Sequence, residues 1–233
     1  MNAPSLAART GGLLRGEPTS ASAWIFARGA GSYAEPLLLL GVGGAIYGAA
    51  IGAWRDPLLA GYVAIKLPLL LVLTTLTNAI VNALTARLLG LELTFAQSLR
   101  TVMLSFGVAG VVLASLAPIV LFFDLALPGP MSTQKHVGHD VLGLSHVGAI
   151  ALAGIAAVRR QQRWLREAFP SSRSRGQVVI AWLAVNLFVG AQISWNLRPW
   201  FGTPVMRVQF LRDDPFDGTF YESVFRMVID HTR

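Results

Sequence analysis

Three histidines and one aspartate that could bind a metal lie close together past the middle of the chain. His136, His139, Asp140 and His146 would share about 120° of one helix face. Imidazole nitrogens and carboxylate oxygens are ligands that Zn²⁺ accepts, and imidazoles also relay protons near neutral pH. Helical zinc motifs place two histidines four residues apart, whereas here the spacings are three and seven. Two interpretations remain: a zinc or proton-relay site, or side chains solvated at a membrane surface, with His146 hydrogen-bonded inside a helical bundle.

A second group of polar side chains recurs at helical spacing within an apolar segment. Thr74, Asn78, Asn82 and Thr85 are three or four residues apart, so they share one face of a helix. Natural partners are the amides of the last apolar segment, Asn186, Gln192 and Asn196. Interhelical hydrogen bonds of this kind contribute about 0.6 kcal/mol each, so this polar stripe either holds helices together or lines a polar path. Lys66, earlier in the same segment, is expected to extend its side chain to the membrane surface.

Glycine recurs every fourth residue in the first apolar segment. Gly44, Gly48 and Gly52 leave one helix face almost free of side chains, so another backbone can approach it closely. Lipid provides no hydrophobic drive between helices, and close contact supplies van der Waals energy instead. This glycine seam predicts tight packing, either within one chain or between subunits.

These side chains need long helices to position them, and the chain contains five apolar stretches of suitable length. A hydrocarbon core about 30 Å thick requires roughly 20 helical residues. The stretches are 36–54, 60–86, 101–123, 137–158 and 177–197. With 54% hydrophobic and 13% charged residues and a mean hydropathy of +0.56, the chain is typical of membrane proteins. We therefore expect an all-α integral membrane protein with an N-terminal arm (1–35), a bundle of about five transmembrane helices (36–197) and a C-terminal tail (198–233).

The arginines predict how the bundle is oriented. Cytoplasmic loops of membrane proteins retain Lys and Arg. The first and third loops hold only Arg55 and Lys135. The arm and the other two loops hold Arg9, Arg15, Arg28, Arg87, Arg100, Arg159, Arg160, Arg163, Arg166, Arg173 and Arg175. We expect a cytoplasmic N-terminus and an external tail. The net charge of +7 reflects this asymmetry and not nucleic-acid binding, because the basic residues flank the apolar stretches.

The two ends of the chain carry interfacial signals. Trp24 to Phe26 beside Arg28 indicate either an interfacial anchor or a disordered arm. An outer interface motif follows the last stretch, with an aromatic belt, a cation and a helix-stopping proline: Trp195, Asn196, Arg198, Pro199 and Trp200. Further on, Thr219 and Glu222 have the spacing of a capping box, which predicts a short amphipathic helix from about 219 to 230. This helix is expected either on the bilayer surface or against a neighbouring subunit.

The sequence SWNLRPWFG at 194–202, followed by FLRDDPFDGTFYESVF at 210–225, resembles the C-terminal signature of a bacterial family of uncharacterised multi-pass inner-membrane proteins. The five-span order with a cytoplasmic N-terminus is also loosely similar to Yip-family proteins. Neither resemblance carries a reaction or catalytic residues. What they imply is a non-enzymatic, multi-pass protein of the bacterial cytoplasmic (inner) membrane.

Sequence motifs of common enzyme classes are missing. The chain has no nucleotide-binding glycine loop, GxSxG elbow or HExxH motif, and it contains no cysteine. We expect a non-enzymatic membrane protein that associates with itself or joins a membrane complex, as a scaffold or as a channel-like assembly. The alternatives are a metal-dependent or proton-relaying membrane enzyme built on the histidine cluster, and a small-solute transporter. No cofactor is predicted beyond zinc at that cluster, and the expected partners are the lipid bilayer and another membrane subunit.

Overall fold

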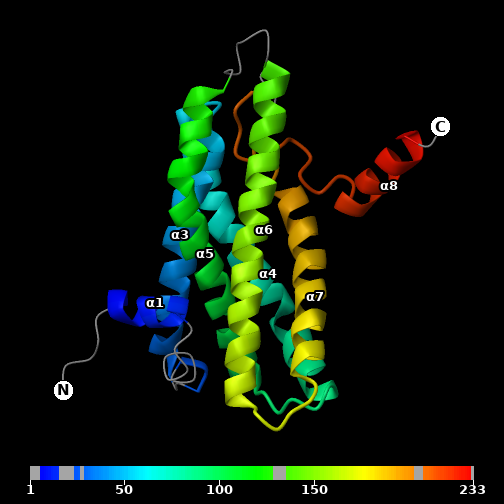
Figure 1. Cartoon of the computed structure of the whole chain (residues 1–233). Helices are drawn as coiled ribbons and strands as arrows, with labels where there is room; N and C mark the ends of the chain where they lie inside the picture. Colours follow the sequence, from blue (N-terminus) through cyan, green and yellow to red (C-terminus); the bar gives the residue numbers. More distant parts are fainter. Residues whose placement is uncertain (1–5, 16–23, 27–28, 128–134, 202–206, 232–233) are drawn as a thin grey trace.

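The structure is a computed structural model that describes residues 6–15, 24–26, 29–127, 135–201 and 207–231, and within these ranges its regular elements are helices. The elements are α1 (Leu6–Arg15), η1 (Ala30–Tyr33), α3 (Ala34–Ala53), α4 (Pro57–Leu88), α5 (Phe95–Ala126), α6 (Lys135–Ala168), α7 (Arg175–Asn196) and α8 (Phe220–His231). Figure 1 shows a bundle of long helices, with α1 toward one end and α8 toward the other. Five of the helices, α3 to α7, are long and apolar enough to cross a membrane, which confirms the expected all-α architecture with five helices of spanning length.

Three of the helices are clearly longer than the apolar stretches that predicted them. α6 continues to Ala168, about ten residues past the predicted end, because charged residues end an apolar stretch without ending helical hydrogen bonding. Capping side chains set the starts of the other two, α4 and α5. Asp56 accepts a hydrogen bond from the Leu58 amide at 2.7 Å ahead of α4, and Thr94 forms a reciprocal capping box with Gln97 ahead of α5.

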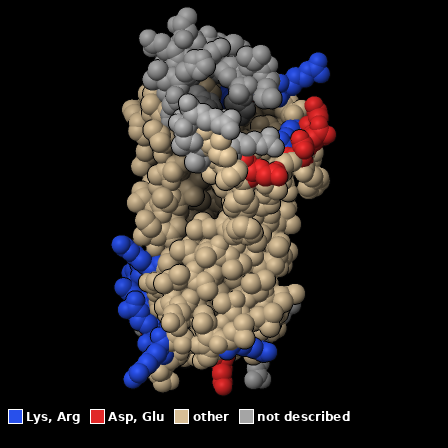
Figure 2. Space-filling model, turned by 90° about the vertical axis from the view of Figure 1, so that its right-hand side faces the viewer, with Lys and Arg blue, Asp and Glu red and all other residues tan. Residues whose placement is uncertain are grey.

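Successive long helices alternate in direction and give the bundle two chemically different ends. The basic end holds the start of α3, the turn at 89–94 and the loop at 169–174; the tail end holds the turn at 54–56 and the segment after Asn196. On the face seen in Figure 2, charged side chains gather toward the two ends and leave an uncharged belt between them. That distribution is the one a helical bundle needs to lie across a hydrocarbon layer.

The glycine seam of α3 packs against α4 of the same chain. A Cβ atom added to Gly52 would lie 2.6 Å from the Cα atom of Ala60, and one added to Gly44 would lie 3.3 Å from Pro68. At Gly48 the added atom would overlap the carbonyl group of Val63. Glycine is therefore required here because two backbones are in direct contact.

A neighbouring face of α3 packs as closely on α5. A Cβ atom on Gly110 would lie 2.9 Å from the Leu39 carbonyl oxygen, and one on Gly43 would overlap the backbone of Gly110. Because α3 contacts two helices through its backbone, it is the central packing element of the bundle. The seam is occupied within the chain.

The segment before α3 packs into the basic end. Trp24 and Ile25 are buried against α5 and α6, with Leu104, Val108 and Trp164 around them, whereas Phe26 is 45% exposed. Two of the three residues predicted as an interfacial anchor therefore pack into the bundle. Arg100 of α5 secures this segment: its Nε donates to the Ser32 hydroxyl at 2.9 Å, and Nη1 donates to the Ile25 carbonyl at 3.5 Å. Its guanidinium also lies over the Tyr33 ring.

Replacing Gly48 by alanine is expected to destabilise the bundle by about 1–3 kcal/mol, because the new methyl group forces α3 and α4 apart. Thermal unfolding of the detergent-solubilised protein measures the loss. The matched control is Gly41→Ala on the same helix, where an added Cβ meets nothing within 4 Å. Both variants gain the same helix propensity, so equal melting temperatures would show that the close α3–α4 contact is wrong.

Candidate functional site

A line of polar side chains lies buried between α4 and α7. The two helices are antiparallel, and residues every fourth position on α4 meet residues every fourth position on α7. Asn78 Nδ2 donates to Asn186 Oδ1 at 3.1 Å, as expected for this pair of amides. One turn toward the basic end, Trp182 Nε1 donates to the main-chain carbonyl oxygen of Asn82 at 2.7 Å. One turn toward the tail end, the Thr74 side chain faces Gly190.

Much of the hydrogen-bonding capacity of this line is unused. Thr74, Asn78 and Asn82 are almost completely buried. In the part of the chain that the structure describes, the Thr74 hydroxyl and both side-chain polar atoms of Asn82 have no hydrogen-bond partner. A buried polar group without a partner costs about 1–3 kcal/mol of folding free energy. These atoms therefore favour a bound molecule that can both donate and accept hydrogen bonds. Thr85 differs, because its hydroxyl donates to the Val81 carbonyl oxygen of its own helix at 2.7 Å.

The other two expected partners of the stripe have different contacts. Gln192 Nε2 donates to Asn196 Oδ1 at 3.1 Å, and Gln192 Oε1 accepts from the Phe220 amide, also at 3.1 Å. Their prediction as partners of the α4 stripe is therefore wrong. They lie near the end of α7, where the chain turns toward α8, so their amides fasten the tail.

A second polar cluster lies near the tail end, between α3 and α6. The Tyr47 hydroxyl and His146 Nδ1 are 3.0 Å apart, and both residues are buried. Which atom donates depends on the imidazole tautomer. The expectation that His146 is hydrogen-bonded inside the bundle is confirmed. The Nε2 atom of His146 is also buried and has no hydrogen-bond partner in the described residues. One imidazole nitrogen can therefore form a hydrogen bond with a bound molecule.

The tail closes over this cluster through Lys66. Lys66 is fully buried, and its Nζ donates to the Pro199 carbonyl oxygen at 2.8 Å. It also lies 5.1 Å from the centre of the Phe210 ring, a cation–π contact. The Phe201 ring lies 5.0 Å from the His146 ring. The expectation that Lys66 extends to the membrane surface is wrong, because the tail brings a carbonyl and a ring to the ammonium group.

The interface motif forms a compact turn. Arg198 Nε donates to the Trp195 carbonyl oxygen at 2.9 Å, and its guanidinium lies over the Trp195 ring. Trp200 Nε1 donates to the Ser194 carbonyl oxygen at 3.0 Å. Burial, with the nearby positive charge of Arg212, lowers the pKa of Arg198. Since Arg212 also approaches the Trp195 ring, this ring offsets part of the repulsion between the two guanidinium groups.

The predicted histidine cluster is only partly visible. The side chains of His136, His139 and Asp140 lie outside the described residues, and His146 points into the bundle toward Tyr47. Among the side chains that the structure does describe, no three His, Asp or Glu residues converge as a metal site would require. The zinc interpretation stays a prediction.

Two residues of the tail-end cluster were not predicted. Tyr47 sits among the small residues of α3, and its only sequence signal was being the one large polar side chain of that helix after Glu35. Asp124, near the end of α5, has two buried carboxylate oxygens without a hydrogen-bond partner in the described chain, and it lies within electrostatic reach of Tyr47. An acidic residue at the edge of an apolar stretch was a usable signal, since such residues in membrane helices often mark polar paths.

Comparison with protein-family models, with curated proteins and with solved structures found no match to this chain. The family resemblance of the tail stays a prediction, and the side chains themselves must carry the functional argument.

Lys66→Met is expected to loosen the tail, because it removes a buried charge-assisted hydrogen bond worth about 1.5–3 kcal/mol. The Arg212 amide, which donates to the Arg198 carbonyl oxygen, reports on the tail. Its hydrogen exchange should accelerate about tenfold or more in Lys66→Met. Leu69→Met, on the exposed side of the same helix, is the control and should leave that exchange unchanged. An unaltered rate in folded Lys66→Met would contradict the closure described above.

Proposed function

We propose that this chain is a non-enzymatic, multi-pass protein of a bacterial cytoplasmic membrane that passes a small, uncharged polar solute through the interior of one bundle. The observation that carries the proposal is the buried polar line between α4 and α7, where Thr74 and Asn82 have hydrogen-bonding atoms that no described residue satisfies. Polar residues inside membrane bundles are costly and tend to line solute paths.

The interior chemistry favours a neutral solute. Amides and hydroxyls both donate and accept hydrogen bonds, as do water, glycerol and urea. The ammonium group of Lys66 and the carboxylate of Asp124 both lie toward the tail end, whereas the line between α4 and α7 carries no charged side chain among its described residues. Neither a cation nor an anion therefore finds a charged partner along that line. The face in Figure 2 is also hollowed in its upper half, toward the tail end.

The charges at the two ends support an orientation for this path. The basic end carries Arg159, Arg160, Arg163, Arg166 and Arg175, together with Arg100. Cytoplasmic ends of membrane proteins retain such residues. We therefore orient the basic end and the N-terminus toward the cytoplasm, and the tail toward the outside.

Asn82→Leu tests the path. In proteoliposomes, the variant should reduce solute-driven volume change in stopped-flow light scattering about tenfold, with water, glycerol and urea as probes. It removes an amide whose two polar atoms lack partners and places a similar apolar volume in the line. Because no hydrogen bond is lost, its thermal stability should be unchanged or raised.

Ser115→Ala is the matched control. Ser115 is exposed on α5, away from the line, and its hydroxyl bonds only to the Val112 carbonyl oxygen. It should keep the permeability of the unmodified protein. Equal permeability of folded Asn82→Leu and the unmodified protein, or no permeability above that of empty vesicles, would contradict the proposal.

A second candidate function, an assembly subunit, is favoured by α8. This helix begins with the predicted capping box, in which Thr219 and Glu222 bond reciprocally at 3.0 and 3.1 Å. Tyr221 stacks on Phe188 at 4.5 Å and fastens the start of α8 to α7. Beyond that contact α8 extends away from the bundle, and Phe225 is 67% exposed (Figure 1). Such a helix either lies on the bilayer or covers a neighbouring subunit.

The mass of the particle in lipid nanodiscs separates the two candidates. A path within one bundle predicts one chain per disc and permeability at that stoichiometry. Assembly through α8 predicts a multiple of the chain mass that returns to one chain when residues 219–233 are removed. A multiple that survives this deletion would contradict assembly through α8.

A further inference from the structure

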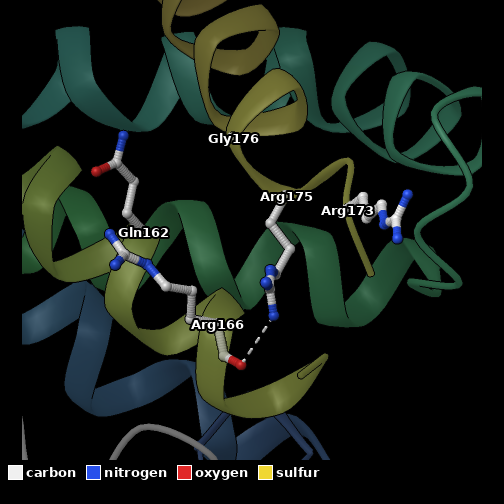
Figure 3. Close-up of a pocket in the computed structure, with 5 residues that line it drawn as sticks. All are labelled: Gln162, Arg166, Arg173, Arg175 and Gly176. Atoms are coloured by element: carbon white, nitrogen blue, oxygen red, sulfur yellow. Dashed lines mark hydrogen bonds between the residues drawn. The ribbon is translucent and has the colours of Figure 1, made fainter. Parts of the chain in front are cut away.

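A cavity of about 250 Å³ lies at the basic end between the end of α6 and the start of α7. Its lining residues are Gln162, Arg166, Arg173, Arg175 and Gly176. Figure 3 shows Gln162 and Arg166 on α6, Arg173 on the loop and Arg175 on the first turn of α7, with the Arg166 and Arg173 side chains on opposite sides of Arg175. Sites for drug-sized ligands measure about 300–1,000 Å³, so this cavity suits a smaller group. We propose that it binds a phosphate group, as carried by an anionic phospholipid.

One arginine is held in place and two are available. Arg175 Nη1 donates to the carbonyl oxygens of Phe169 at 2.7 Å, Pro170 at 2.9 Å and Arg166 at 3.3 Å, which closes the loop around the cavity. The guanidinium groups of Arg166 and Arg173 make no hydrogen bond within the described residues. Three guanidinium groups without a carboxylate among the lining residues favour an anion, and their planar forks match phosphate oxygens.

The start of α7 adds a second, independent feature. Ser174 is its N-cap residue, yet its side chain caps no amide, and the first turn contains no acidic residue. Most helix starts satisfy their first amides with a side-chain oxygen. Here Arg175 and Gly176, which contribute two of those amides, line the cavity, so a phosphate oxygen can take the place of the missing cap.

The depth of the cavity points to a lipid headgroup. The apolar stretch of α6 ends near Val158, and Gln162 and Arg166 follow it by one and two helical turns. In a bilayer this level is occupied by phosphate headgroups, and basic pockets between helices at the cytoplasmic side bind anionic lipids. Orientation rules alone require arginines at this end, but they do not require three of them around one cavity beside an uncapped helix start.

The test is thermal unfolding of the full-length protein in a neutral detergent with added lipid or salt. Phosphatidylglycerol should raise the melting temperature by several degrees, and phosphatidylcholine should not. The double variant Arg166→Gln/Arg173→Gln should lose most of that increase. A second arm compares sodium phosphate with sodium chloride at equal ionic strength. An increase in sodium phosphate that this variant also loses would support the site and identify free phosphate as a ligand.

The matched control is Arg159→Gln/Arg163→Gln, which removes the same charge from exposed positions of α6 outside the cavity. It should keep the phosphatidylglycerol response. Equal losses in the two double variants, or no response of the unmodified protein to either anion, would overturn the proposal. If the double variant does not fold, Arg166→Lys replaces it. This variant retains the positive charge without the planar guanidinium fork, so it should bind phosphatidylglycerol measurably more weakly than the unmodified protein. A phosphatidylglycerol response equal to that of the unmodified protein would also count against the site.

Discussion

The bundle depends on direct backbone contact of α3 with α4 and α5. In a bilayer the apolar side chains gain nothing by leaving lipid for protein, so helices must associate through close van der Waals contact and hydrogen bonds. Gly48 and Gly52 provide that contact toward α4, and Gly43 with Gly110 provides it toward α5. Any side chain at these positions would separate the helices. The relative positions of the remaining helices follow from this closely packed centre.

With α4 placed against α3, its opposite face is available to α7, and the polar residues of the two helices meet there. The shared four-residue spacing brings Asn78 to Asn186 and Asn82 to Trp182. The same placement leaves Lys66 near the tail end, where its ammonium group must donate to an acceptor of the protein or reach water. The tail supplies the Pro199 carbonyl oxygen, so a costly buried charge organises the segment after α7.

The bundle thus separates two chemistries along its length. The line between α4 and α7 holds neutral amides and hydroxyls with unused donors and acceptors, whereas the basic end holds guanidinium groups around a cavity. The two proposals share no residue, so each can be tested by variants that leave the other site intact. A protein that binds an anionic headgroup at one end can still pass neutral molecules through its centre.

Local patterns along the chain were enough to predict the five long apolar helices, the capping box at Thr219, the closely packed face at Gly48 and the shared face of Thr74, Asn78 and Asn82. Each of these depends on helical periodicity or on hydrophobicity over a few neighbouring residues, which a sequence states directly. Periodicity says which residues share a face and does not say what that face meets. The Tyr47–His146 bond joins residues 99 positions apart, and Lys66 meets a carbonyl 133 positions away. Those contacts, the burial of Trp24 and the cavity around Arg166 were decided by the tertiary structure, because long-range packing selects among many locally equivalent arrangements.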